Sequence, residues 1–239
     1  MKYIIYTISM IAFVLVSAMT GNEIMAQVDD NLSQPQDQYM IMTLKLTDKN
    51  GTQTESSIMM MQRGNDRRIG KFLSPPDQKG IGFLSLPNNE MYIYLPAYKQ
   101  IKSISGNTKG GSFANTDFTY EDMEAIEYTV KFDAELIDST ADSYTVKLVP
   151  KDDSDYKYQM MTIEKEHMAV TKIEFFKNKE TPVKTMTRSD FETVDGYYTA
   201  RKIKMVDHIS NHSTVMEIGD CEFDTDIEND VFTTGFLKE

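Results

Sequence analysis

The chain has 239 residues, one cysteine, no tryptophan and a formal net charge of -12 at pH 7. This acidic balance argues against nucleic-acid binding and against tight electrostatic attachment to anionic membranes, because both select for basic patches. The single cysteine, Cys221, excludes an internal disulfide and is expected to be a small buried side chain near a strand end.

The first 26 residues have the pattern of a secretory signal peptide. Lys2 supplies the early positive charge, an apolar run follows, and a short polar stretch precedes Ala26. We expect cleavage after Ala26, and a cut after Ala18 satisfies the preference for small residues about as well. An uncleaved anchor helix is the other interpretation, but the apolar run is near the short end of the roughly 17 to 25 residues that a membrane span needs.

Residues 27–239 are expected to form a single, monomeric periplasmic domain. The first mature residue would be Gln27, and Cys221 lies far from this junction, so no cysteine is placed for an N-terminal lipid anchor. Residues 27–38 are polar and contain a proline, which predicts a loose N-terminal arm.

From Tyr39 onward the pattern predicts strand after strand. Short alternating segments are bounded by Gly, Pro, Asn or Asp, and each is too short for a helix. The clearest alternation covers residues 128–136, with one apolar face and one solvated face. Only residues 115–126 predict a helix in the mature chain, because Glu121 and Asp122 suit a helix start and Phe118 can share a face with later apolar residues.

Signatures of enzymes and metal sites are weak. The serines are not in a G-x-S-x-G nucleophile elbow, and Asp117, Glu121 and Asp122 are typical of a capped, solvated helix start. The histidines lie beside turns or at strand edges without thiolate or carboxylate ligands at metal spacing; they are His167, His208 and His212. We therefore predict no catalytic residue, no metal and no cofactor.

Methionine is abundant, with 17 residues in the chain. Its flexible, polarisable side chain fills irregular space and accommodates variable apolar partners. A methionine-rich core and a methionine-lined cavity use the same alternation, so the pattern alone leaves both open.

The segment from Lys71 to Met123 has a distinctive order of parts: a Pro-Pro turn, GIGFL, YIYLP, KQIKSI and F-x-x-x-D-F-T-Y-E-D. It resembles the LolA-like family of outer-membrane lipoprotein-sorting proteins, and the resemblance continues through VKLVPKDDSDYKYQ, TKIEFFKNKETPVKT and VFTTGFL. The resemblance implies a mainly β fold: a single curved antiparallel sheet, a half-barrel of about eleven strands, with a short helical lid. LolA-type proteins usually begin with an amphipathic helix, which the polar arm does not supply, so we expect a more open cavity mouth.

The resemblance also implies a non-enzymatic periplasmic carrier. Its partners would be lipoprotein acyl chains or free lipid, received from an inner-membrane transporter and moved toward the outer membrane. Each buried methylene would contribute about 0.8 kcal/mol. The alternatives are a same-fold periplasmic sensor or regulatory binding protein and, third, a lipid or glycan hydrolase. The candidate lipid-binding residues are Phe72, Leu73, Phe83, Leu84, Ile93, Leu95, Phe113, Phe118, Tyr120, Met123, Tyr128, Val130 and Phe132.

Overall fold

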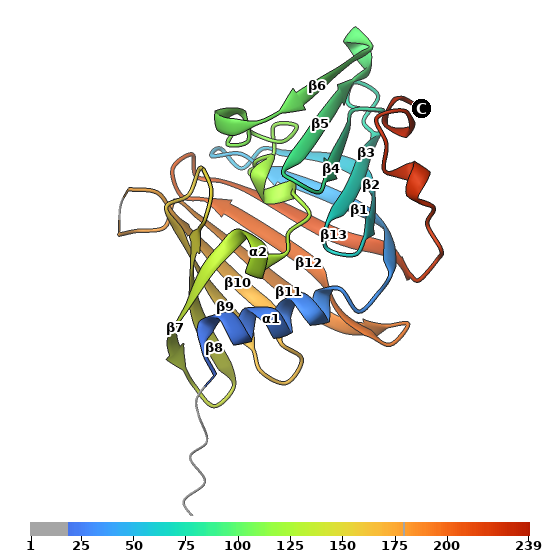
Figure 1. Ribbon diagram of the computed structural model, residues 1–239. Coiled ribbons are helices and arrows are strands. Elements are labelled where there is room, and N and C mark those ends of the chain that lie inside the picture. Colours follow the sequence, from blue (N-terminus) through green and yellow to red (C-terminus); the bar gives the residue numbers. More distant parts are fainter. Residues whose placement is uncertain (1–18, 179) are drawn as a thin grey trace, which may run out of the picture.

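The computed structural model describes residues 19–178 and 180–239, so the apolar run of the expected leader lies almost wholly outside the described residues. Its main feature is one antiparallel sheet of 13 strands, curved around a hollow (Figure 1). The predicted fold class is confirmed, with two strands more than the count of about eleven that the resemblance implied.

The first half of the sheet contains β1 (Asp37–Thr47), β2 (Gln53–Arg63), β3 (Arg67–Ser74), β4 (Gly82–Leu86), β5 (Glu90–Leu95) and β6 (Gln100–Ile104). The second half contains β7 (Phe132–Ser139), β8 (Ser143–Pro150), β9 (Tyr158–Glu164), β10 (Ala169–Phe176), β11 (Lys184–Val194), β12 (Tyr197–Asp207) and β13 (His212–Phe223). The two α-helices are α1 (Gly21–Leu32) and α2 (Tyr128–Lys131).

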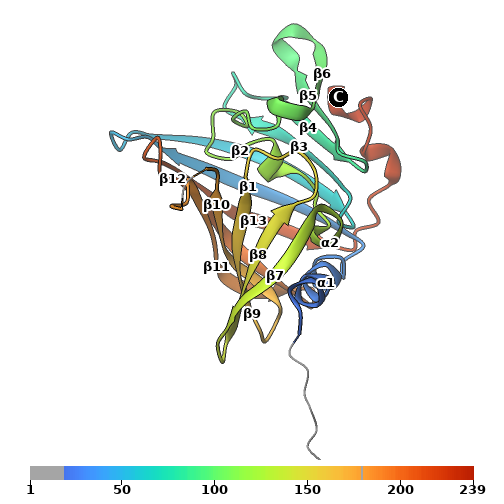
Figure 2. The ribbon, with the colours of Figure 1, turned by 60° about the vertical axis from the view of Figure 1, so that its left-hand side comes forward.

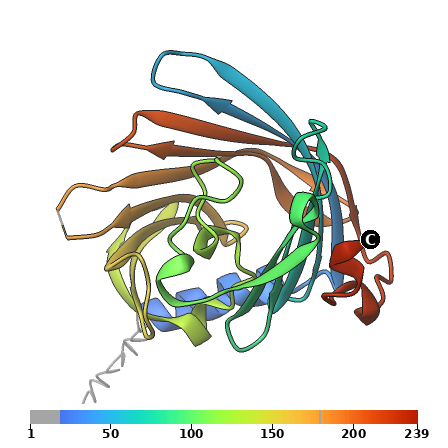
Figure 3. The ribbon, with the colours of Figure 1, turned by 90° about the horizontal axis from the view of Figure 1, so that it is seen from above.

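The two halves are meanders that meet at β1 and β13. The strand order is β6-β5-β4-β3-β2-β1-β13-β12-β11-β10-β9-β8-β7, so β6 and β7 are the edges. Residues 105–131 join these two edges, and we call them the crossing segment. Seen from above, the sheet curls round and part of this segment lies within its curve (Figure 3). One stretch of chain therefore connects both edges of the half-barrel and covers its hollow.

Strand alternation places the main core on the concave face. In β9, Gln159, Met161 and Ile163 are buried while the residues between them are partly exposed, as a strand with one packed face requires. A second, smaller cluster lies apart from this core, where Ile69 and Leu84 pack against residues 227–237 of the C-terminal segment. Figure 1 shows this segment beside β3 and β4, outside the hollow.

The expected loose N-terminal arm is wrong, because α1 occupies much of that sequence. Thr20 and Glu23 form a capping box at its start, and Ile24, Met25 and Val28 are buried on one face. Three apolar residues at helical spacing are enough once the sheet supplies a surface to pack on. A prediction based on the apolar content of residues 27–38 missed the helix because two of the three residues precede residue 27.

Helix α1 crosses the open side of the curved sheet, from β7 in the second half to the β2–β3 turn in the first (Figures 1 and 2). At one end, the backbone N–H of Ala134 in β7 donates to Asn22 Oδ1 of the helix over 3.0 Å. At the other, Asn65 Nδ2 in the β2–β3 turn donates to the Asp29 carbonyl over 3.0 Å. A Cβ on Gly21 would lie 2.5 Å from the Ala134 carbonyl oxygen, so this approach requires glycine. The amphipathic helix that LolA-type proteins usually have is therefore present.

The predicted helix over residues 115–126 is also wrong. The region contains one 3-10 turn, Glu121–Met123, and both Ala114 and Asn115 have positive φ. Asp122 accepts a hydrogen bond from Thr119 N over 2.8 Å, so its carboxylate holds a local turn and does not begin a longer helix. The strand predicted from Tyr128 begins four residues later, because α2 occupies Tyr128–Lys131. In this helical turn Val130 points to solvent and is 63% exposed.

Among the described residues, no helix combines the length and the apolar character needed to cross a membrane.

Candidate functional site

A cavity of about 220 Å³ lies on the concave face between the sheet and the crossing segment. It is larger than an engineered apolar cavity of about 150 Å³ that binds benzene. It is smaller than the roughly 300 to 1,000 Å³ of pockets that enclose drug-sized ligands. As it stands, it suits one short apolar segment, and a longer chain requires the crossing segment to move.

Methionine is the most frequent apolar residue in the lining. The cavity-lining methionines come from β1, β2, β11, β13 and the crossing segment; they are Met40, Met42, Met60, Met123, Met186 and Met216. Ile203 of β12 and Ile218 of β13 complete this wall. Unbranched thioether chains can repack around ligands of different shape, so the wall favours an adaptable apolar ligand.

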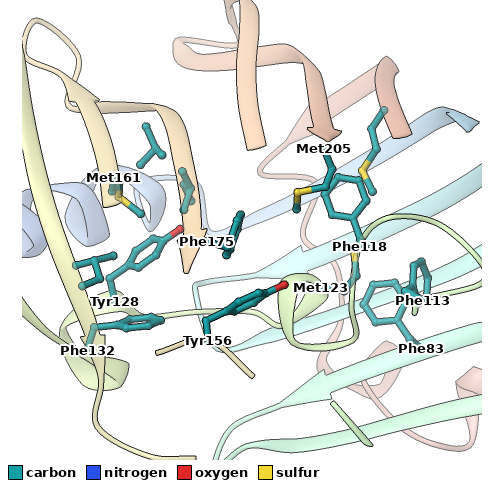
Figure 4. Close-up of a cluster of buried hydrophobic side chains, with 14 of the residues drawn as sticks. Phe83, Phe113, Phe118, Met123, Tyr128, Phe132, Tyr156, Met161, Phe175 and Met205 are labelled. Carbon is teal, nitrogen blue, oxygen red and sulfur yellow. The ribbon is translucent and has the colours of Figure 1, made fainter. Parts of the chain in front are cut away.

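The β3–β5 side of the concave face is filled with aromatic side chains. Phe113 of the crossing segment lies 5.5 Å from Phe72 and 5.0 Å from Phe83, measured between ring centroids. All three are fully buried. Figure 4 shows Phe113 beside Phe83, with Phe118 apart from this pair. Phe113 therefore closes this side as ordinary core.

The predicted site residues divide into three groups. Four line the cavity, and they are Phe118, Met123, Tyr128 and Phe132. Six pack within or against the main core without lining the cavity, and they are Phe72, Phe83, Ile93, Leu95, Phe113 and Tyr120. Three are directed elsewhere: Leu84 packs in the second cluster, and Leu73 and Val130 are 41% and 63% exposed. None of these three faces the cavity: for Leu73 and Leu84 a short alternation does not identify the inward face, and Val130 lies in the helical turn α2 and not in a strand.

Arg68 of β3 ties the crossing segment to the first half of the sheet. Its Nη1 donates to the carbonyls of Met123 over 3.2 Å and Glu124 over 3.1 Å. Burial and the nearby Arg188 lower the pKa of Arg68 to about 10, which still leaves the guanidinium charged at neutral pH.

Glu124 braces the crossing segment internally, through two lysines of the same segment. Its buried carboxylate pairs with Lys109 and Lys131, one on each oxygen. Burial, followed by the nearby Lys109, lowers the pKa of Lys131 to about 8. Glu121 accepts from Asp155 N over 3.0 Å, which adds a bond to the β8–β9 connection.

Asp122 and Asp117 tie the segment to the second half of the sheet. Asp122 accepts from the Tyr156 hydroxyl over 3.2 Å and lies 3.6 Å from Lys184 Nζ. Asp117 accepts from the Thr214 hydroxyl over 2.7 Å. Burial raises the pKa of both carboxyls. The expectation of a solvated helix start is therefore wrong, because these acids are buried anchors of the cavity cover.

Sequence reasoning missed the polar residues of the cavity. Arg68, Arg188, Gln38 and Gln62 all line it, yet none of them was among the site residues predicted from the sequence, and Gln38 was expected in the loose N-terminal arm. Strand alternation could have identified Arg188, because it follows Met186 by two residues in β11 and both side chains therefore face the hollow.

The histidines and the cysteine lie outside this cavity. His167 Nδ1 is 3.2 Å from Glu164, within a turn that also brings Glu166 close, and its ring stacks on Tyr198. Glu164 accepts from the backbone of the same turn, so these groups have a structural role. Cys221 is half-buried against the main core, as expected, and burial raises its thiol pKa.

Solved structures with the same architecture define a LolA-like fold. A domain from Vibrio parahaemolyticus that carries the name outer-membrane lipoprotein-sorting protein is 27% identical, with a TM-score of 0.80 over 92% of this chain and 98% of that one. The LolA superfamily protein NE2245 from Nitrosomonas europaea is 17% identical, with a TM-score of 0.77 over 92% and 100%. A DUF1329 family protein from Desulfovibrio piger is 21% identical, with a TM-score of 0.83 over 91% and 97%.

These similarities confirm the LolA-like resemblance. A family model described as an uncharacterized protein matches residues 64–239, most of the chain, and the chain belongs to that family. No curated protein matches the sequence.

Proposed function

We propose that this protein is a non-enzymatic periplasmic carrier that binds acyl chains of lipoproteins or free lipids and moves them toward the outer membrane. The observation that carries the proposal is the methionine-lined cavity on the concave face of a LolA-like sheet. Each methylene buried there would contribute about 0.8 kcal/mol, so a chain of ordinary length could be held without a covalent bond.

Loading and release would involve the crossing segment. This segment covers the cavity and is held to the sheet by Arg68, Asp122 and Asp117. Opening it would break these buried polar contacts and expose Phe118 and Met123, so it would need a partner or an incoming apolar chain to compensate. A donor in the inner membrane would open this cover, and a monomeric carrier would then cross the periplasm with its cargo enclosed.

Export would begin with removal of the leader after Ala18. A cut after Ala26 would delete the first half of α1, including the buried Ile24 and Met25. A cut after Ala18 leaves Thr20, the N-cap of α1, in the mature chain. The intact mass of protein isolated from the periplasm tests this, because it distinguishes a chain beginning at Met19 from one beginning at Gln27 or Met1.

A transfer assay tests the carrier activity. Donor vesicles containing a fluorescent acylated lipopeptide are mixed with acceptor vesicles and the mature protein, and transfer is followed as loss of quenching. We expect Ala200→Phe to reduce the rate, because Ala200 lines the cavity and the new ring would fill it. The matched control is Lys204→Phe, on the exposed face of the same strand. Equal rates with and without wild-type protein would contradict the proposal.

A further inference from the structure

Two arginines face the cavity from opposite halves of the sheet. Arg68 lies on β3 and Arg188 on β11, and four strands separate them in the sheet order. The curvature brings them close enough for Arg188 to lower the pKa of Arg68 and for both to counter the effect of burial on Tyr128. A cavity suited only to neutral acyl chains does not need two guanidinium groups in its wall.

The two arginines differ in how their donors are used. Arg68 is well bonded: Gln62 Oε1 accepts from its Nε over 2.8 Å and from its Nη2 over 2.6 Å, in addition to the two carbonyls of the crossing segment. Arg188 has a buried Nε with no hydrogen-bond partner. Within residues 19–178 and 180–239, no carboxylate lies within 4.0 Å of either guanidinium.

The carboxylates that line the same cavity are already bonded to groups other than Arg188. Glu124 pairs with two lysines, Asp122 bonds to Thr119, Tyr156 and Lys184, and Glu121 bonds to the backbone of Asp155. Asp29, beside Tyr128, accepts from Tyr128 N and Thr129 N over 2.8 Å each. Arg188 therefore remains as a cation in the cavity wall without a counter-ion among the described groups.

The register places Arg68 at a polar end of the cavity. Met42 pairs with Ile58, Met40 with Met60, and Gln38 with Gln62, which in turn pairs with Arg68. Along β1 and β2 the inward side chains thus change from apolar to polar within three successive rows. Such a gradient matches a ligand with an apolar chain and a polar head. Arg188 pairs with Ile203 of β12, in a row that continues to Met216 of β13 and Leu44 of β1, so the curvature of the sheet and not the register brings Arg188 near Arg68.

We propose that the cavity takes a single-chain amphiphile with a carboxylate head, a fatty acid, whose carboxylate binds Arg188 while its chain lies among Met40, Met60 and Met186, the crossing segment moving aside where the chain exceeds the cavity. This rests on the proposed carrier function and names the ligand class. A guanidinium presents a planar fork of donors that matches a carboxylate, and such charge-assisted pairs are strong where water is excluded. The small volume favours one chain over two.

Binding of dodecanoic acid and dodecanol, measured by calorimetry at pH 8, tests the proposal. The two ligands share one chain and differ in the head. We expect wild-type mature protein to prefer the acid by about tenfold or more. Arg188→Met should remove this preference, Arg188→Lys should retain part of it because the charge stays, and Lys204→Met should leave it unchanged because it removes a charge from the exposed face.

The outcomes separate this proposal from the carrier proposal. Equal affinity of the wild type for acid and alcohol would overturn the carboxylate head and leave acyl binding standing. Binding of neither would overturn both. A preference that survives in a folded Arg188→Met variant, checked by circular dichroism, would overturn the role of Arg188.

Discussion

The two sides of the concave face use different side chains and are filled to different degrees. On the β3–β5 side, Phe113 of the crossing segment packs against Phe72 and Phe83 and leaves these rings fully buried. On the other side, methionines and isoleucines, together with Phe118, Phe132 and Phe175, line a cavity of about 220 Å³. Both sides have the same strand alternation, so the difference comes from what the crossing segment inserts between them.

The two sides are suited to different roles, one to stability and the other to ligand binding. The aromatic side fixes one end of the crossing segment and contributes mainly to stability, since close-packed rings resist rearrangement. The methionine side is adaptable and is covered by a segment held through polar contacts. Substitutions on the two sides should therefore separate stability from ligand binding.

The largest expected effect is on the aromatic side. Phe113→Ala should lower the free energy of unfolding by about 3 to 5 kcal/mol, because it removes a fully buried ring and leaves a cavity. Acyl affinity of the folded fraction should stay close to that of the wild type. Urea unfolding and ligand titration on the same sample check both. A large loss of affinity with little loss of stability would break the proposed division of roles.

The matched variant on the methionine side is Phe118→Ala. Phe118 is 3% exposed and lines the cavity, so one side of its ring already lacks protein contacts. We expect a smaller loss of unfolding free energy than for Phe113→Ala and a changed affinity for acyl chains, with longer chains favoured by the enlarged cavity. If chain-length preference is unchanged, Phe118 does not belong to the binding wall.

The smallest expected effect on the free energy of unfolding comes from Asp122, a buried residue that holds the crossing segment to the sheet. Burial raises the pKa of Asp122 above its usual 3.8, so the native carboxyl holds its proton more tightly than the unfolded one. Its contribution to stability is therefore present at low pH and is lost as the pH rises through the raised pKa. Asp122→Asn should cost most near pH 4 and least at neutral pH. Unfolding curves of both proteins across this range measure the difference, and a cost that grows toward neutral pH would contradict the assignment.

The strands of the sheet could be predicted from the sequence, but the conformation of the crossing segment could not. Alternation over strands such as Ser143–Pro150, where Val146 and Leu148 are buried, identifies a half-buried strand without tertiary information. The crossing segment depends on distant partners: Asp117 bonds Thr214, Asp122 bonds Tyr156, and Arg68 bonds the carbonyl of Glu124. No local pattern encodes such pairs, so acids that suited a helix start are buried anchors in the structure.

Helix α1 was missed for a related reason. Its apolar residues, Ile24, Met25 and Val28, straddle the expected cleavage point after Ala26. Of the candidate site residues, Phe118, Met123, Tyr128 and Phe132 line the cavity, and their binding of lipid stays a prediction. Leu84 and Val130 do not line it, since the inward face of a short strand and the start of β7 depend on packing.

Native mass spectrometry of mature protein, purified from the periplasm without detergent, would test acyl binding by the methionine-lined cavity most directly. The wild type should retain one bound lipid, Lys204→Phe should retain it as well, and Ala200→Phe should lose it, because Ala200 lines the cavity and Lys204 is exposed. A wild-type protein without bound lipid, even after incubation with acylated lipopeptide, or retention that does not differ among the three proteins, would contradict a lipid-binding role for this cavity.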